Sequence, residues 1–225
     1  MGQFAIIMSQ HPVLTSVSAG LFIGGCFMKV LVNGENFRHQ IAAVLLKSSL
    51  ISEKNAYFKF DLRAFIEDVL QQKDIEIAYY TTKIKKPNYK LPIKLKNNID
   101  LINLSNRKWL ADLTNNNVKI IKAGYLRVRE SNKCIHCGKK TLVLQEKGVD
   151  VRVATDLVLS QQKEAIVLAS SDSDLIPALN AKLQTGITVS YLCYSGSLNR
   201  SVAAQVSKTI TFDDSTIIKH FTGNQ

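Results

Sequence analysis

Short apolar runs alternate with amphipathic segments along most of the chain. Runs rich in Val, Ile and Leu, bounded by Gly, Asn, Asp or Ser, predict buried strands. They cover residues 29–33, 75–80, 118–128, 165–169, 187–192 and 209–212. Between them, apolar residues recur at spacings of three and four, which predicts helices. The helices are expected over residues 37–50, 61–72, 98–113, 151–160, 175–183, 197–206 and 216–221.

This alternation predicts the fold class. Strands that are apolar throughout are typical of a parallel sheet with both faces covered. We therefore expect an α/β fold, a three-layer sandwich around a mostly parallel central sheet. Residues 28–225 would form one such domain, with a polar, cysteine-containing insert at about 129–147. Ligands of such sheets bind beyond the carboxyl ends of the strands, so the residues that follow each predicted strand are candidates for a site.

Residues 1–27 differ from the rest of the chain because they contain no Lys, Arg, Asp or Glu. Their apolar stretch of about 15 residues is shorter than the ~20 that a membrane-spanning helix needs. No basic segment precedes it, as one would in a secretory signal. We expect residues 1–27 to be an extension upstream of a natural start at Met28, and we expect no membrane partner. The alternative is a weak membrane tether.

The composition agrees with a folded domain that binds polyanions. Apolar residues make up 46% of the chain and charged residues 21%, which supports a core and excludes a disordered chain. The net charge is +11, and fifteen of the 29 Lys and Arg residues lie within residues 83–140 beside only three acidic residues. Such a block is typical of nucleic-acid binding; a solvated lysine surface is the alternative. The scattered cysteines exclude a disulfide scaffold and favour the reducing cytoplasm.

The first part of the basic block mixes lysines with tyrosines. The tyrosines are Tyr79, Tyr80 and Tyr89, and the lysines of the loop between them and residue 96 include Lys85, Lys86 and Lys90. Aromatic rings stack on unpaired bases while lysines bind phosphates, so we expect this loop to contact single-stranded RNA. In the alternative, Tyr79 and Tyr80 merely end a strand, with one ring in the core. Trp109 is interpreted as helix packing.

Two carboxylates follow the apolar run 165–169. Asp172 follows Ser171 directly, and Asp174 is separated from Asp172 by one residue. Both lie at the start of a predicted helix. Mg²⁺ and Mn²⁺ prefer oxygen ligands, and Mg²⁺ keeps several waters, so a few carboxylates suffice for a site. The alternative is ordinary capping, since Asp is favoured at helix N-termini.

Two more acidic residues belong to the helix predicted after Gly148. Asp150 lies where this helix begins, and Asp156 lies six residues later on a helix that is otherwise mostly apolar. A carboxylate among apolar residues needs a partner, which a metal ion or Lys147 would supply. The alternative places Asp156 on a solvent-facing stripe.

The first predicted strand ends in an Asn-Gly-Glu-Asn turn. Asn33 is an uncharged oxygen ligand, Glu35 adds a carboxylate, and Asn36 could fix the turn by bonding its own backbone. This turn and the Asp172–Asp174 pair both fall at strand carboxyl ends. Because parallel strands end at the same edge of a sheet, we expect the turn and the Asp172–Asp174 pair at one edge.

Together these motifs resemble the NYN domain, a family of the PIN-like nuclease superfamily that includes the LabA-like proteins. The resemblance covers residues 29 to about 213. It rests on strand-Asn-Gly-Glu-Asn-Phe from residue 33, Glu-Lys-Gly-Val-Asp-Val-x-x-Ala-x-Asp from residue 146, and Ser-Ser-Asp-Ser-Asp-Leu-x-Pro-Ala-Leu from residue 170. Asn33 departs from the family pattern, which usually has Asp at this strand end.

The resemblance implies an acidic pocket that holds Mg²⁺ or Mn²⁺ and cleaves RNA. The residues that match the family's acidic positions are Asp150, Asp156, Asp172 and Asp174, and Glu35 would complete the metal site. The residues expected to contact substrate are Asn33, Asn36, Lys147, Ser171, Lys85, Lys86 and Lys90. The predicted function is a metal-dependent endoribonuclease acting on single-stranded RNA.

Two alternatives remain open for the function. Loss of the first carboxylate at Asn33 weakens metal binding and fits a catalytically weak RNA-binding module on the same fold. A phosphatase or Toprim-type site is disfavoured, because only 51 residues follow Asp174 and Glu35 matches the Toprim Glu loosely. No Gly-rich phosphate loop is present in the sequence, which argues against a nucleotide cofactor.

Cys134 and Cys137 form a single Cys-x-x-Cys-Gly motif in the insert. A structural Zn²⁺ needs four ligands and this motif supplies two. The alternatives are a zinc ion completed by His39, His220 or a second subunit, a reversible disulfide, or two reduced cysteines. A zinc ion shared between two copies would make the protein a homodimer.

Overall fold

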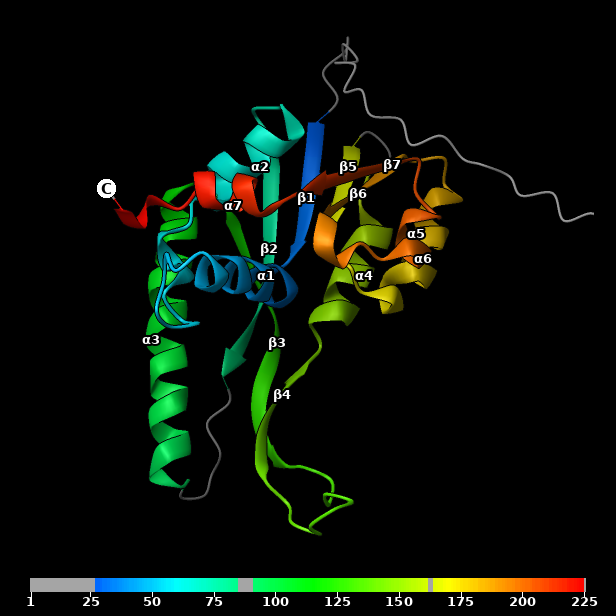
Figure 1. The fold of residues 1–225 in the computed structure, drawn as a ribbon. Coiled ribbons are helices and arrows are strands. Elements are labelled where there is room, and N and C mark those ends of the chain that lie inside the picture. The colour runs from blue at the N-terminus through cyan, green and yellow to red at the C-terminus, as the bar shows by residue number, and fades with distance from the viewer. Residues whose placement is uncertain (1–26, 85–90, 162–163, 225) are drawn as a thin grey trace, which may run out of the picture.

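The computed structural model describes residues 27–84, 91–161 and 164–224, which form an α/β sandwich of three layers (Figure 1). Its central sheet has seven strands in the order β4-β3-β2-β1-β5-β6-β7. All neighbours are parallel except β3 and β4. The strands are β1 (Phe27–Asn33), β2 (Glu76–Ile84), β3 (Lys119–Glu130), β4 (Leu142–Lys147), β5 (Glu164–Ala169), β6 (Val189–Tyr194) and β7 (Lys208–Phe212). The predicted fold class is confirmed.

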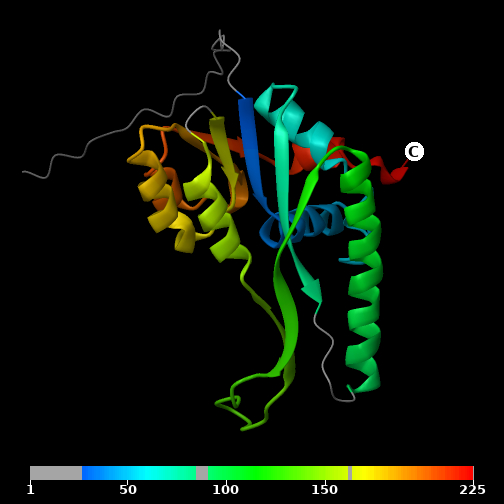
Figure 2. The same cartoon turned by 180° about the vertical axis from the view of Figure 1, so that it is seen from behind.

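Helices cover both faces of the sheet (Figures 1 and 2). One face carries α1 (Gly34–Lys47), α2 (Leu62–Leu70), α3 (Ile93–Asn115) and α7 (Asp214–Lys219). The other face carries α4 (Val149–Leu159), α5 (Ile176–Leu183) and α6 (Arg200–Ala203). Short 3-10 turns, η1 to η4, link several of these elements. No helix within the described residues is long and apolar enough to cross a membrane.

The central strands are apolar throughout because successive side chains enter opposite layers. Val30 and Val32 of β1 pack in the core with α1 and α2, whereas Leu31 packs with α4 and α5. Trp109 of α3 lies in the first of these cores and is 1% exposed. Its ring meets Tyr57 at 5.5 Å and Tyr79 at 6.0 Å between centroids, edge to face. The interpretation of Trp109 as helix packing is confirmed.

Beyond the end of β2, strands β3 and β4 continue as a two-stranded arm that projects from the carboxyl edge of the sheet (Figure 1). The segment 129–147 was expected to be a polar connection, and that expectation is wrong at both ends. Strand β3 runs to Glu130, and Leu142–Lys147 pairs with it as antiparallel β4. The short apolar stretch in β4 has no clear periodicity of its own; it becomes a strand because the free edge of β3 supplies backbone partners.

Gly34 begins α1, where the chain turns directly from β1 into the helix. A Cβ atom there would lie 2.3 Å from the Tyr80 carbonyl oxygen and 2.5 Å from the Tyr79 ring. The Tyr79 hydroxyl also donates a hydrogen bond of 3.0 Å to the Gly34 carbonyl. The helix can approach β2 this closely only because residue 34 has no side chain.

We expect Gly34→Ala to lower the free energy of unfolding by about 2 kcal/mol, the usual cost of forcing extra atoms into a packed site. Urea denaturation measures this change. The sign of this change tests the close approach. Ala favours helices over Gly by about 1 kcal/mol, so Gly34→Ala would stabilise the protein if the space were open. A gain in stability would contradict the close approach.

Asp213 caps α7 and its stability contribution depends on pH. Its carboxylate accepts hydrogen bonds from the Ser215 hydroxyl (2.7 Å) and from the backbone and side chain of Thr216 (2.9 and 2.8 Å), which lower its pKa to about 2. A folded-state pKa below the unfolded value gives stability that is present above pH ~4 and lost as pH falls toward ~2.

We expect Asp213→Ala to reduce the free energy of unfolding at pH 7 by about 1 kcal/mol or less, because the cap is solvent-exposed and screened. The difference from the unmodified protein should shrink as the pH is lowered from 4 toward 2. Denaturant titrations at several pH values measure it. Asp213→Asn is the control, since it keeps a capping oxygen and removes the charge. A difference that grows in acid would contradict the assignment.

Candidate functional site

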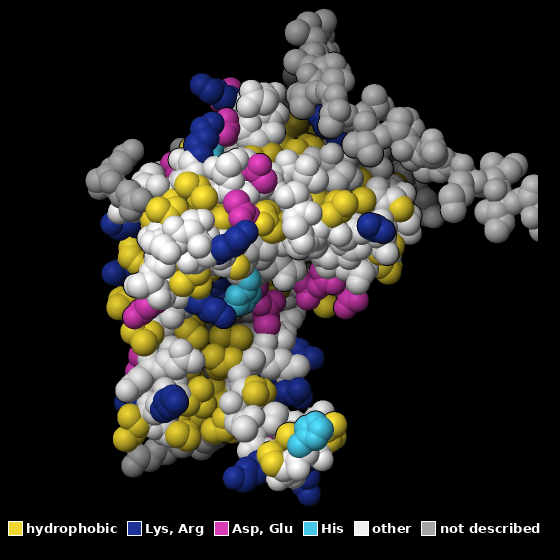
Figure 3. Space-filling view, in the orientation of Figure 1, with side chains coloured by type: hydrophobic (Ala, Val, Ile, Leu, Met, Phe, Trp, Pro, Cys, Tyr) yellow, Lys and Arg dark blue, Asp and Glu magenta, His cyan; other side chains and the backbone are white. Residues whose placement is uncertain are grey.

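Acidic side chains from four elements gather at the carboxyl edge of the sheet. Glu35 comes from α1, Glu146 from β4 and Asp150 from the first turn of α4, and Asp172 and Asp174 follow β5. We call these five residues the acidic cluster. Figure 3 shows acidic side chains where the body of the molecule overhangs the arm, with Lys and Arg side chains along the arm below. The carboxyl ends of β1 and β5 lie at the same edge of the sheet, as expected, because the two strands are adjacent and parallel.

The loop after β5 holds the Asp172–Asp174 pair in a fixed shape. One Asp172 carboxylate oxygen accepts the backbone N–H of Asp174 at 2.9 Å and caps the turn η2 (Ser173–Leu175). The Asp172 N–H donates to the Ser170 hydroxyl oxygen at 3.3 Å. One carboxylate oxygen of Asp172 therefore serves as the cap of this turn. Its other oxygen and the exposed Asp174 carboxylate are not needed for the turn.

Ser171 is held from the neighbouring strand and helix. The Tyr191 hydroxyl donates to the Ser171 hydroxyl oxygen at 2.8 Å, and the Asn199 side-chain amide donates to the Ser171 carbonyl at 2.9 Å. Tyr191 belongs to β6, and Asn199 caps α6. These contacts give Ser171 a role in positioning the Asp172 loop.

Asn33 links β1 to Asp150. Its amide oxygen accepts the backbone N–H of Asn36 at 3.4 Å and caps α1, which leaves its amide nitrogen facing Asp150. That nitrogen donates to an Asp150 carboxylate oxygen at 2.9 Å. Asn33 is only 2% exposed. A buried neutral amide thus occupies the position of the family's usual Asp and supports one side of the Asp150 carboxylate.

Gly148 explains the turn from β4 into α4. Its φ of +95° is a left-handed conformation that glycine adopts without strain, and it places Asp150 on the first turn of the helix. Gly124 of β3 lies against the same turn, where a Cβ atom would be 2.2 Å from the Lys147 carbonyl. The Lys-Gly-Val-Asp motif therefore fixes where Asp150 sits relative to the sheet.

The acidic cluster carries more negative charge than its surroundings neutralise. Burial, with Glu35 and Asp150 nearby, raises the pKa of Glu146 to about 7. Burial, with Asp172 and Asp174 nearby, raises the pKa of Asp150, while the Asn33 hydrogen bond opposes that rise. Arg38 lowers the pKa of Glu146, and its guanidinium pairs with Glu35. A bound cation would relieve this repulsion.

Glu146 and Arg38 were not among the residues expected to form the site. Glu146 precedes the Lys-Gly-Val-Asp motif directly, and it is β4 that carries it into the cluster. Arg38 lies one turn after Glu35 on α1 and also donates to the Tyr57 hydroxyl at 3.1 Å and to Asn106 at 3.0 Å. The helical spacing of residues 35 and 38 was the available signal for this pair.

Magnesium and manganese fit the chemistry of these donors. Within the described part of the chain, no three Asp, Glu, His or Cys side chains are close enough to hold an ion as they stand. Mg²⁺ requires only one or two carboxylates and completes its shell with water. Asp150 and Asp172, whose charges act on each other, are the residues that would hold it, with Asp174 and Glu146 near them.

Asp156 lies apart from the acidic cluster. It is six residues beyond Asp150, which is about 9 Å along a helix. Its carboxylate accepts a hydrogen bond of 3.0 Å from the Tyr80 hydroxyl and one of 2.8 Å from Arg152. The partner that this half-buried carboxylate requires is therefore Tyr80 with Arg152, rather than Lys147.

The tyrosines expected to stack on RNA lie in the core. Tyr79 and Tyr80 are 1% and 0% exposed, so the prediction that their rings contact bases is wrong. Their side chains enter opposite layers of the sandwich because they are successive residues of β2. Tyr89 and the predicted contacts Lys85, Lys86 and Lys90 lie outside the described residues.

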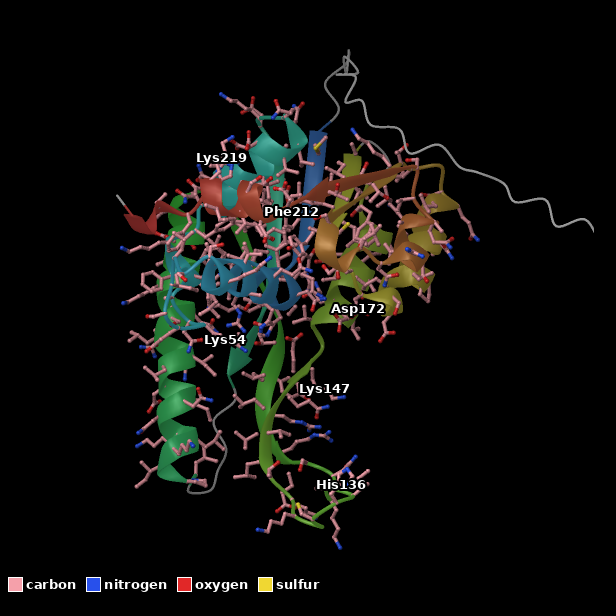
Figure 4. The ribbon with its side chains drawn as sticks, viewed as in Figure 1. Lys54, His136, Lys147, Asp172, Phe212 and Lys219 are labelled. Carbon is pink, nitrogen blue, oxygen red and sulfur yellow. The ribbon has the colours of Figure 1, made fainter. Side chains whose placement is uncertain are left out.

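One face of the arm, opposite the face that carries Glu146, is basic. The β3–β4 register pairs Tyr125 with Lys147 and Arg127 with Gln145, so Lys147, Arg127 and Arg129 share one face of the arm. All three are exposed. Figure 4 places Lys147 on the arm below Asp172. The opposite face carries Leu126, Val128 and Leu144, in register with Glu146.

A parallel α/β sandwich with an acidic cluster at its carboxyl edge has the features of a PIN-like nuclease fold. The family model of the NYN domain matches residues 28–213, and the chain belongs to this family. No curated protein matches the chain. A crystal structure of a protein of unknown function from Vibrio parahaemolyticus is similar, with a TM-score of 0.45 and 13% identity over 86% of this chain and 98% of that chain.

Proposed function

We propose that the protein is a metal-dependent endoribonuclease that cleaves single-stranded RNA with Mg²⁺ or Mn²⁺. The observation that carries the proposal is the acidic cluster beside a basic arm in a member of the NYN family. Asp150 and Asp172 would hold the metal ion. Asp174 and Glu146 keep the pocket acidic, so that it favours a cation over a phosphate alone.

The chain's own residues prepare the pocket before substrate arrives. Asn33 orients the Asp150 carboxylate, and Ser171 with Tyr191 and Asn199 fixes the loop that carries Asp172. A bound divalent ion supplies the remaining chemistry, because it polarises a phosphate and lowers the pKa of a bound water. Preorganised ligands matter here, since phosphodiester hydrolysis places developing charge on the phosphoryl oxygens.

The basic face of the arm would bind the RNA backbone and guide it to the acidic cluster. Lys147, Arg127 and Arg129 are cations on one face of the arm, and Lys147 lies on the arm below Asp172. The separation of charges suits both the RNA and the metal ion. Lysine and arginine attract the phosphates, and the acidic pocket admits a phosphate only together with a cation.

We expect Arg127→Ala/Arg129→Ala to weaken RNA binding and to lower the slope of log affinity against log salt by about 1.4, since each phosphate contact with single-stranded RNA adds ~0.7. Fluorescence anisotropy at several salt concentrations measures both. The control is Lys73→Ala/Lys208→Ala, which removes the same charge at the opposite, amino-terminal edge of the sheet. Equal loss in both variants would mean that the arm has no special role.

The function is tested by cleavage of a labelled single-stranded RNA with Mn²⁺, with Mg²⁺ and with EDTA. A matched duplex RNA tests strand preference. Asp172→Asn/Asp174→Asn is the matched variant, because Asn keeps the size and capping oxygen of Asp. Metal-dependent cleavage that the variant loses is the expected result. Cleavage that persists in EDTA or in the variant would overturn the proposal.

The Asn33–Asp150 hydrogen bond favours one second candidate, an RNA-binding module that cleaves weakly. Asn33 brings no charge to the place where the family pattern has Asp, and its amide nitrogen is a donor that cannot bind a metal ion. Salt-sensitive RNA binding without cleavage in any metal would select this candidate.

A further inference from the structure

The loop at the tip of the arm brings two cysteine sulfurs together. The backbone N–H groups of His136 and Cys137 and the Cys137 thiol lie close to the Cys134 sulfur. The loop is closed by Gly138 N–H to the Cys134 carbonyl at 2.8 Å and by Cys134 N–H to the Lys139 carbonyl at 2.9 Å. Gly138 has a φ of +65°, and a Cβ atom there would meet nothing within 4 Å. The tight turn thus aims two amides at one sulfur.

This arrangement suits a metal-bound pair of thiolates. Amide donors stabilise sulfur in its charged form, and thiolate is the form that binds Zn²⁺. The acidic cluster does not use these residues, which lie at the far end of the arm (Figure 4 labels His136 there). Both cysteines are exposed, so solvent metal can reach them.

Within the described residues, no third His, Cys, Asp or Glu side chain lies close enough to complete a metal site with this pair. A structural zinc site is tetrahedral and needs four. Cys193 is buried in the core, and His220 is hydrogen-bonded to Asp68 at 2.9 Å. Both belong to the body of the sandwich, from which the arm projects away (Figure 1).

We propose that Cys134 and Cys137 from two copies of this chain bind one Zn²⁺ between them, as a four-thiolate site that joins two arms into a homodimer. A two-fold axis through the metal supplies four sulfurs from two identical loops, which is the usual symmetry of a protein dimer. The partner is a second copy because an identical loop presents the same pair of sulfurs.

Two properties of the tip fit this pairing. Ile135, between the two cysteines, is 92% exposed, an unusual environment for a large apolar side chain that a second arm would cover. Lys133 and Lys139 flank the cysteines, and two like-charged tips would repel each other. A zinc ion with four thiolates has a net charge of −2, so the shared site attracts the flanking lysines of both copies.

The test uses the full chain, purified reduced and with its thiols confirmed by mass spectrometry. We expect one zinc ion per two chains by elemental analysis and a dimer mass by sedimentation, both lost on chelation and restored by zinc. Cobalt in place of zinc should give the absorption of a tetrahedral thiolate site, saturating at one ion per two chains. Cys134→Ser/Cys137→Ser should be monomeric and zinc-free, with the same thermal stability as the chelated, unmodified protein because the loop is exposed.

Two control variants separate this site from others. His136→Asn should keep zinc and dimer, since it leaves all four thiolates in place. Asp172→Asn/Asp174→Asn should also keep both, which distinguishes the tip from metal bound at the acidic cluster. A monomer with one zinc per chain, a Cys134–Cys137 disulfide that forms in place of metal binding, absence of zinc binding, or a dimer that survives in the cysteine variant would each overturn the proposal.

Discussion

Asp150→Asn is expected to reduce the rate of RNA cleavage by about 10²- to 10³-fold at saturating RNA, the usual effect of removing one preorganised group that stabilises charge in the transition state. The substitution keeps the size of the side chain, and an amide oxygen at residue 150 can still accept from Asn33. It removes the charge that would hold the metal ion. RNA affinity should hardly change, because the proposed contacts with the RNA backbone lie on the arm.

The free energy of unfolding and the titration of Glu146 give independent readouts for this variant. Asp150 is half-buried beside Asp172 and Asp174, which raise its pKa, so loss of its charge should leave the free energy of unfolding unchanged or slightly higher. The pKa of Glu146 should fall below its value of about 7, because Asp150 is one of the groups that raise it. Carboxyl-carbon NMR titration measures that fall.

Asp156→Asn is the matched control on the same helix. Its carboxylate is bonded to Tyr80 and Arg152, so we expect its loss to change cleavage less than tenfold, well short of the effect at Asp150. Equal losses in the two variants would place Asp156 in the site after all. Full activity of Asp150→Asn would remove the basis of the proposed metal site.

The sandwich could be predicted because each central strand is recognisable from its own apolar residues. Buried strands such as 165–169 are apolar on both faces, and the side chains that begin or end helices (Asp61 of α2, for example) act locally. Asp61 accepts the Ala64 N–H at 3.0 Å, as an N-cap residue does. Parallel order then follows from the alternation of strands with helices, without knowledge of distant contacts.

The features that could not be predicted, strand β4 and the burial of Tyr79 and Tyr80, depend on contacts between segments that are distant in the sequence. Strand β4 exists because β3 offers it an edge, and Glu146 enters the acidic cluster only through that pairing. Likewise, Tyr79 and Tyr80 look accessible beside a lysine-rich loop, yet β2 lies inside the sheet between β1 and β3. Local patterns record neither fact. The acidic positions 150, 172 and 174 were recognisable because they follow helix and strand boundaries that the pattern does record.

Asn33→Asp is expected to make the protein's stability depend strongly on divalent metal. The new carboxylate would keep its cap on the Asn36 N–H, while its second oxygen would replace an N–H donor that lies 2.9 Å from an Asp150 oxygen. Two buried carboxylates at this separation cannot both be charged without a cation. In EDTA we expect the free energy of unfolding to fall by about 2 kcal/mol, the typical cost of an unsatisfied buried polar group.

Metal should reverse that loss and bind more tightly than in the unmodified protein. A further carboxylate beside Asp150 should raise the affinity for Mn²⁺ by about 10- to 100-fold, at least the effect that groups around metal sites commonly have. Calorimetric titration measures the affinity, and thermal melts with Mn²⁺ or EDTA measure the stabilisation that binding produces. If the unmodified protein cleaves RNA weakly, the same substitution should increase its rate.

The pH dependence distinguishes this mechanism from simple damage. Mutual repulsion raises the folded-state pKa values of Asp150 and of the carboxyl introduced beside it, so in EDTA the loss of stability should be smallest in mild acid and grow as the pH rises. Asn33→Ala is the control, because it also removes the hydrogen bond to Asp150 but adds no charge; unlike Asn33→Asp, it loses the α1 cap as well. Its destabilisation should be insensitive to metal. If Asn33→Asp behaves in the same way, Asp150 is not a metal ligand, and Asn33 then supports a binding surface and no catalytic pocket.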